Sequence, residues 1–203
     1  MNRAFSQKYN LPLWRTLFYC PVLLTLLACV PELGLAQNAS ALPSQLKLYP
    51  VQGTNVNELM DDIALKSISG TGAFGYTKLN TQLQWESIQK RNGECSLGTV
   101  DLSYTVTIYM PEWTNRSEAK SCLQNNWNAV WRNIRDHEET HKELYNKLHI
   151  PSIKTRLKTI QKQASCERLS EAVNAEMNRI LEENNALHDA FHNANTPPVL
   201  RDC

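Results

Sequence analysis

The sequence His137-Glu138-Glu139-Thr140-His141 lies in a segment that we predict to be a long amphipathic helix. Residues four apart on a helix lie on nearly the same face, so His137 and His141 point the same way. Two imidazoles on one face can bind one zinc ion, with Zn–N distances of about 2.0–2.1 Å. Glu138 lies between them, where its carboxylate can reach a water on the metal without binding the metal. This H-E-x-x-H pattern is typical of zinc-dependent peptidases, in which a zinc-activated water attacks and the glutamate is the general base.

The alternative interpretation of this segment is a solvated, charge-rich helix turn. Charged side chains surround the motif, namely Arg135, Asp136, Lys142 and Glu143. The two histidines, however, continue an apolar stripe formed by positions 130, 134, 137, 141, 144 and 148. Buried imidazole nitrogens need partners. The pattern therefore favours a metal site over paired structural histidines.

The N-terminal residues 1–36 are predicted to be a secretory signal peptide. Arg3, Lys8 and Arg15 provide a basic region, residues 17–30 are apolar, and small residues follow at 34–36. The apolar run is shorter than the roughly 20 residues that span a bilayer. We therefore expect export, with a secreted or periplasmic product. A retained anchor, or a lipid on Cys29, would be its only link to a membrane.

After this segment we expect a flexible lead-in at 37–46, one domain at 47–193 and a C-terminal tail at 194–203. The net charge of +1 gives no indication of a nucleic-acid partner. We expect a peptide or protein substrate, and the oligomeric state stays open. Four cysteines remain outside the signal peptide, which favours disulfides in an exported chain and allows three connectivities: Cys95, Cys122, Cys166 and Cys203.

The hydrophobic pattern predicts strands before helices. Alternating apolar residues indicate strands at 76–88 and 100–110, joined by a turn at Asn92-Gly93, with a shorter strand at 48–51 and a helix at 55–66. Pro111 is predicted to end the last strand, because proline cannot donate to a strand ladder.

Helical periodicity dominates the second half of the chain. A capping box of Asn115 and Glu118 predicts a helix from about 116 to 149, and Pro151 should break or kink it. A short helical segment follows at 153–160, and a second long helix covers 169–191. The predicted fold class is α+β, with a small antiparallel sheet followed by two or three long helices that carry the zinc site.

A catalytic zinc site normally has three protein ligands. The extended pattern H-E-x-x-H-x-x-G-x-x-H is excluded, because Leu144 and Lys147 occupy its last two fixed positions. The third ligand must come from elsewhere, and His188 on the second long helix is the first candidate. It lies in step with Ile180 and Asn184 on the apolar stripe of that helix. Other candidates follow it in this order: Glu167, Glu171 or Glu176, then His149 and His192.

The chain resembles a bacterial family of predicted secreted zinc-dependent proteases, domain of unknown function 922. The resemblance covers about 47–189 and rests on five segments: Tyr49-Pro50-Val51-Gln52-Gly53, Gly75-Tyr76-Thr77, Met110-Pro111-Glu112-Trp113, the H-E-x-x-H motif and Cys166-Glu167-Arg168-Leu169. His188 matches the histidine of the family's terminal motif, but the threonine and glycine of that motif are absent. The resemblance implies bacterial export and a Zn²⁺ site of His137, His141 and His188.

We therefore expect an exported zinc metallopeptidase in which Glu138 accepts a proton from water and returns it to the leaving amine. A zinc amidase acting on cell-wall peptides could use the same ligands. The alternative outside enzymology is an exported binding module with a structural or vestigial zinc site, which four protein ligands would close.

Overall fold

The computed structural model describes residues 44–195 and 199–201. The predicted signal segment and Cys203 lie outside this part of the chain. Strand β1 (Gln45–Val51) and helix α1 (Val56–Lys66) come first, followed by strands β2 (Tyr76–Gln89) and β3 (Cys95–Trp113). The helices α2 (Ser121–Leu144), α3 (Ile150–Leu157) and α4 (Cys166–Ala194) complete the fold. The predicted α+β class, with a small sheet followed by helices, is confirmed.

The sheet has three strands in the order β1-β3-β2. Strands β2 and β3 form the expected antiparallel hairpin, but β1 pairs parallel to β3, so the sheet is mixed. The chain leaves β1 through α1 and returns along β2 in the opposite direction, which makes β3 run the same way as β1. Strand β1 also begins at Gln45, a few residues before the predicted start.

The prediction that Pro111 ends β3 was wrong, because the strand continues to Trp113. Strand β2 begins at Tyr76, opposite Tyr109, so the last residues of β3 pair only with β1. A proline is tolerated at a strand position with a neighbour on one side only, because its backbone then does not have to donate a hydrogen bond on the open side.

The capping prediction at Asn115 was also wrong, since α2 begins at Ser121 and only a 3₁₀ turn, η1 (Arg116–Glu118), follows Asn115. The Asn115 side chain instead accepts hydrogen bonds from the Gly53 backbone N–H and the Trp113 indole, both at 3.0 Å. It therefore fastens the end of β3 to the loop after β1.

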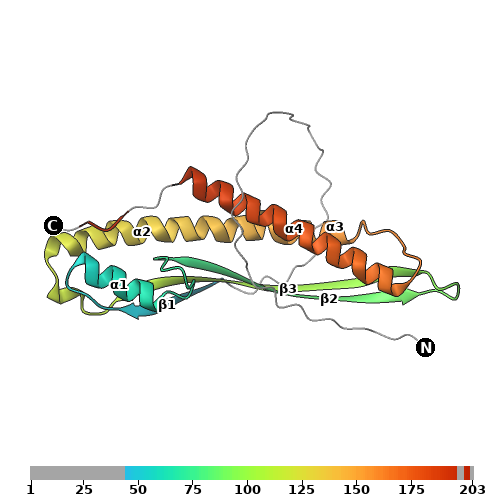
Figure 1. Ribbon diagram of the computed structural model, residues 1–203, viewed down its shortest axis with the longest axis horizontal. Helices are drawn as coiled ribbons and strands as arrows, with labels where there is room; N and C mark the ends of the chain where they lie inside the picture. Colours follow the sequence, from blue (N-terminus) through green and yellow to red (C-terminus); the bar gives the residue numbers. More distant parts are fainter. Residues whose placement is uncertain (1–43, 196–198, 202–203) are drawn as a thin grey trace.

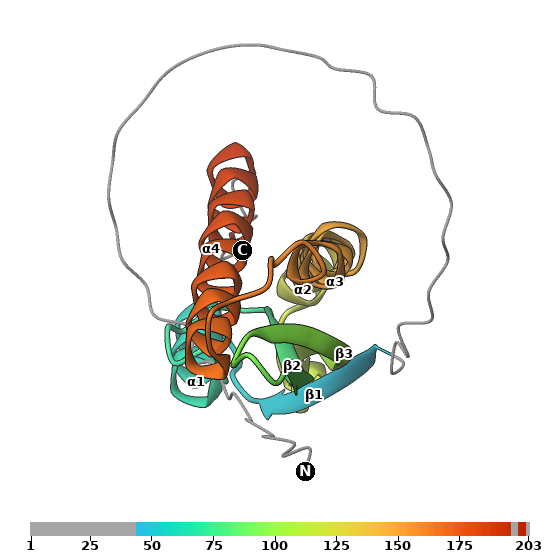
Figure 2. The same ribbon diagram turned by 90° about the vertical axis from the view of Figure 1, so that its right-hand side faces the viewer.

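Helices α2, α3 and α4 lie on one side of the sheet (Figures 1 and 2). Figures 1 and 2 show α2 and α3 running along the sheet, while α4 runs back across them. Helix α4 starts beside the β2–β3 hairpin, and its C-terminal end stands away from the sheet (Figure 1). The C-terminal half of α4 crosses the C-terminal part of α2, where the H-E-x-x-H motif lies.

Pro151 does not break the helical path. A π-helical turn, η2 (Tyr145–His149), joins α2 to α3, and Pro151 sits in the first turn of α3. The first turn of a helix tolerates a proline, because its N–H groups have no partner within the helix. The wider turn rotates the following residues, so that Tyr145 and His149 are buried while Leu148 is exposed. The predicted stripe through 144 and 148 is corrected accordingly.

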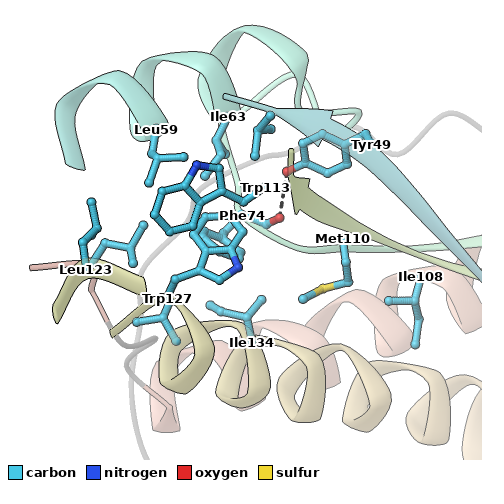
Figure 3. Packing of buried hydrophobic residues seen from close by; sticks show 13 residues of the cluster. Tyr49, Leu59, Ile63, Phe74, Ile108, Met110, Trp113, Leu123, Trp127 and Ile134 are labelled. Carbon is cyan, nitrogen blue, oxygen red and sulfur yellow. Dashed lines mark hydrogen bonds between the residues drawn. The ribbon is translucent and has the colours of Figure 1, made fainter. Parts of the chain in front are cut away.

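Two hydrophobic clusters form the core. In Figure 3 the first packs between α1 and α2, with Trp113, Phe74 and Trp127 in contact at centroid distances of 4.9 and 5.2 Å. The Tyr49 hydroxyl donates a 2.8 Å hydrogen bond to the Phe74 carbonyl. The second cluster packs the β2–β3 hairpin against α3 and α4. Together the clusters fix α2 and α4 on the sheet, on either side of the motif.

A disulfide joins Cys95 at the start of β3 to Cys166 at the start of α4, with a Cα–Cα distance of 4.9 Å. Cys122 is disulfide-bonded as well. Disulfides fit an oxidising compartment outside the cytoplasm. Across the described ranges, none of the helices combines the length and the apolar character that crossing a membrane requires.

Candidate metal centre

Helix α2 turns the motif toward both the sheet and α4. Its buried side chains include Ile134, Glu138 and His141, whereas His137 is half-buried at the edge of this face. The sequence stripe had placed His137 inward and said nothing of the burial of Glu138. The motif therefore splits between two neighbours, with Glu138 against β2 and the two histidines against α4.

Helix α4 contributes a second pair of histidines four residues apart, His188 and His192. Such a pair shares one helix face, as His137 and His141 do on α2. The ring centroid of His141 lies 4.7 Å from that of His188 and 4.6 Å from that of His192. His149, the fifth histidine of the chain, is close enough to His188 to affect its pKa. All five histidines of this protein gather at one crossing of two helices.

Three of these histidines form a group that could hold a metal ion: His137, His141 and His192. Their ligand nitrogens all lie within 4.8 Å of one another. The Nε2 atoms of His137 and His141 are 3.1 Å apart. Two nitrogens on one tetrahedral zinc ion lie about 3.3 Å apart, given Zn–N bonds of about 2.0–2.1 Å. The pair from α2 thus already has the spacing of two zinc ligands.

His188, the third ligand predicted from sequence, lies outside this group. Its Nδ1 is 2.6 Å from Nδ1 of His141, whereas Nε2 of His141 faces His137. The group contains His192, which the sequence had ranked behind His188. The sequence signal for His192 as a ligand is the spacing of four between the two histidines of α4. This spacing places both histidines on the same helix face.

Glu176, which the sequence offered as a ligand candidate, and Glu183 are engaged in ion pairs. Glu176 pairs with Arg156 and Arg179, and Glu183 pairs with Arg156. The two pairs made by Arg156 join α3 to α4, whereas the Glu176–Arg179 pair lies within α4.

The two imidazoles of α2 favour their neutral form. Burial first, and then the neighbouring His188, His192 and His137, lower the pKa of His141 to about 3. Burial, followed by the charge of His192, also lowers the pKa of His137. Metal ions bind the neutral imidazole through a free nitrogen lone pair. His137 and His141 are thus in the protonation state that metal binding requires.

Glu138 lies in a protein pocket on the sheet side of α2, only 5% exposed. The Thr77 hydroxyl lies 2.7 Å from its Oε2 and 3.0 Å from its backbone oxygen. Burial raises the pKa of Glu138 to about 7, although hydrogen bonding from the Thr77 side chain and from the Thr77 backbone opposes this shift. A carboxyl group with a pKa near neutrality can both accept and release a proton at physiological pH.

Gly75 makes room for this glutamate. A Cβ atom at position 75 would lie 2.7 Å from the Ile134 side chain and 2.9 Å from that of Glu138. Such distances are shorter than van der Waals contact, so any side chain here would push α2 away from β2. Gly75 and Thr77 together fix the position of Glu138 between strand and helix.

His149 makes the stability of the fold depend on pH. It is 3% exposed, and burial lowers its pKa to about 4 from an ordinary value near 6.5. The unfolded chain therefore binds a proton first, so stability is fully present above about pH 6.5 and falls as pH drops toward 4. Between pH 7.5 and 4.5 this group should account for about 2 to 3 kcal/mol of unfolding free energy.

Urea unfolding of the metal-free protein at both pH values checks this prediction, with His149→Gln as the comparison. The variant should lose less stability on acidification than the wild type does. An equal loss in both proteins would contradict the assignment to His149.

The chain matches the family described as "Bacterial protein of unknown function (DUF922)" over residues 46–196. This match covers most of the chain, so the protein belongs to that family. Neither the curated proteins nor the solved structures contain a match. The family assignment made from sequence is confirmed, while the family's description leaves the activity open.

Proposed function

We propose that this member of the DUF922 family is an exported zinc-dependent metallopeptidase. His137, His141 and His192 would hold the zinc ion, and Glu138 would act as the general base. The observation that carries the proposal is the convergence of three imidazoles from two helices, with ligand nitrogens within 4.8 Å of one another, beside a buried glutamate of the H-E-x-x-H motif.

The exposure of the three histidines supports a catalytic rather than a closed site. His141 is buried, His137 half-buried and His192 exposed, so the group opens to solvent on the side of α4's C-terminal end. Catalytic zinc sites keep one position free of protein ligands, whereas structural sites are closed by four. An open side beside His192 is where an extended peptide could approach.

Zinc in such a site polarises a carbonyl group and makes water a stronger acid. Glu138 supplies the proton transfer, and its pKa of about 7 suits both directions. The carboxylate would take the proton of the attacking water and return it to the leaving amine. The Thr77 hydroxyl, 2.7 Å from Oε2, holds the carboxylate in place. The account also favours amide bonds over esters as the natural target, because an amine leaving group needs that proton.

The second candidate is an exported binding module with a structural or vestigial zinc site. The presence of His188 beside His141 favours it, because a fourth histidine could close the coordination sphere after a small rearrangement. The two candidates differ in whether zinc-loaded protein hydrolyses anything.

Metal-dependent hydrolysis tests the proposal. We expect zinc-loaded protein to cleave unfolded casein or a cell-wall peptide, to lose this activity after dialysis against a chelator, and to recover it with one equivalent of zinc. Cleavage of the cell-wall peptide alone would point to the amidase alternative. Stable zinc binding without cleavage of either substrate would favour the binding module, and activity that survives chelation would contradict the proposal.

A further inference from the structure

His188 lies behind His141, on the side away from His137. The two Nδ1 atoms are 2.6 Å apart and the rings are stacked at an interplanar angle of 21°. The ring of Tyr145 packs against the ring of His188, with a centroid distance of 4.5 Å. His188 is therefore held by packing as well as by its contact with His141.

The contact at Nδ1 fixes which nitrogen of His141 carries the proton. An imidazole that binds metal through Nε2 must be protonated at Nδ1, and that N–H is set by its hydrogen-bond partner. Nε2 of His141 faces His137, and Nδ1 faces His188. His141 must then donate to Nδ1 of His188, which places the proton of His188 on its own Nε2.

The far side of His188 contains acceptors for that proton. Within the described residues, three buried side-chain atoms have no hydrogen-bond partner: His188 Nε2, His149 Nδ1 and Asn184 Oδ1. Asn184 precedes His188 by one helical turn on the same face of α4, and both Asn184 and His149 are less than a tenth exposed. Asn184 Oδ1 and His149 Nδ1 are therefore buried polar atoms that can support the N–H of His188.

We infer that His188 is a positioning residue that holds His141 in its Nδ1-protonated form and aims Nε2 at the metal, with Asn184 and His149 as the polar support behind it. This inference rests on the proposed metal site and gives His188 a role other than ligand. A nitrogen that accepts a hydrogen bond from His141 cannot also donate its lone pair to the ion. The orientation of His141 is thereby set before the metal arrives.

Two substitutions separate positioning from ligation. In His188→Asn, the amide oxygen stands where Nδ1 stood and can still accept from His141, whereas His188→Leu removes the acceptor and keeps the bulk. Asn185→Ala, on the exposed face of the same helix, is the control. Zinc affinity is measured by competition with a chromophoric chelator, and cobalt absorption spectra report the ligand set.

We expect one zinc per chain in every one of these proteins. His188→Leu should bind zinc about 10- to 100-fold more weakly, in the range found for groups that orient a ligand. His188→Asn should recover most of that loss, and the cobalt bands should keep their shape in both variants. In the zinc-loaded wild type, the His141 Nδ1 proton should give a downfield NMR signal that disappears in His188→Leu.

Several results would overturn the inference. Equal zinc affinity in His188→Leu and wild type would remove any positioning role. Loss of stoichiometric zinc in both His188 variants, with altered cobalt bands, would make His188 a ligand, as the sequence predicts. A wild type that binds no zinc would contradict both the proposed function and this inference. The first two results would contradict the inference alone.

Discussion

Replacing Glu138 by glutamine is expected to lower kcat by about 10²- to 10⁴-fold, the usual contribution of a general acid–base group. Glutamine has nearly the same shape and still accepts the hydrogen bond from Thr77, which at present reaches Oε2 at 2.7 Å. It cannot take up a proton from water. The substitution therefore removes the chemistry of Glu138 and leaves the neighbouring histidines in place.

The measurement pairs steady-state hydrolysis with zinc content in the same preparation. Zinc should stay at the wild-type level, because Glu138 is not among the three clustered histidines. Glu143→Gln, at an exposed glutamate of the same helix, is the matched control and should keep nearly full activity. Normal turnover in Glu138→Gln would show that the base is another group.

Removing the disulfide between Cys95 and Cys166 should have the largest effect on stability. The cross-link closes a segment with a sequence separation of 71 residues. A loop of that length implies about 4 kcal/mol of stabilisation through the unfolded state. In a domain of this size the melting temperature of Cys95→Ala/Cys166→Ala should fall by about 10 °C.

The same variant should keep its zinc at low temperature. His188 lies 22 residues beyond Cys166 on α4, which corresponds to about 33 Å along a helix. Two backbone hydrogen bonds between Cys95 and Gln163, of 2.9 and 2.8 Å, also remain at the end of the hairpin. Gln163→Ala keeps those backbone bonds and the disulfide, so it should be nearly as stable as wild type. A double-alanine variant within 1 kcal/mol of wild type would contradict the estimate drawn from loop closure.

Local sequence signals predicted the elements that are held by local forces. The hairpin at Asn92-Gly93 and the strands on either side follow from turn chemistry and alternation, and Gly93 indeed adopts a positive φ of 88°. The helix that carries His137 and His141 follows from periodicity. The parallel pairing of β1 could not be predicted this way, because it depends on contacts between residues about 60 positions apart.

The candidate site shows the same limit. The spacing of His137 and His141 is local and was sufficient to place both on one helix face. The choice between His188 and His192 is not local, since both lie on the same face of α4 and only the crossing of α4 over α2 determines which approaches His137. The inward position of Glu138 is equally non-local, because it depends on the space that Gly75 leaves just before β2.

The most direct measurement is the zinc content of the purified chain, compared with His192→Ala and with Asn193→Ala as an exposed neighbour on the same helix. The account predicts one zinc per chain in the wild type and in Asn193→Ala after dialysis against a weak chelator, and far less in His192→Ala. Equal zinc in all three proteins would exclude His192 as a ligand. No zinc in the wild type, with its disulfides intact, would contradict the metal centre itself.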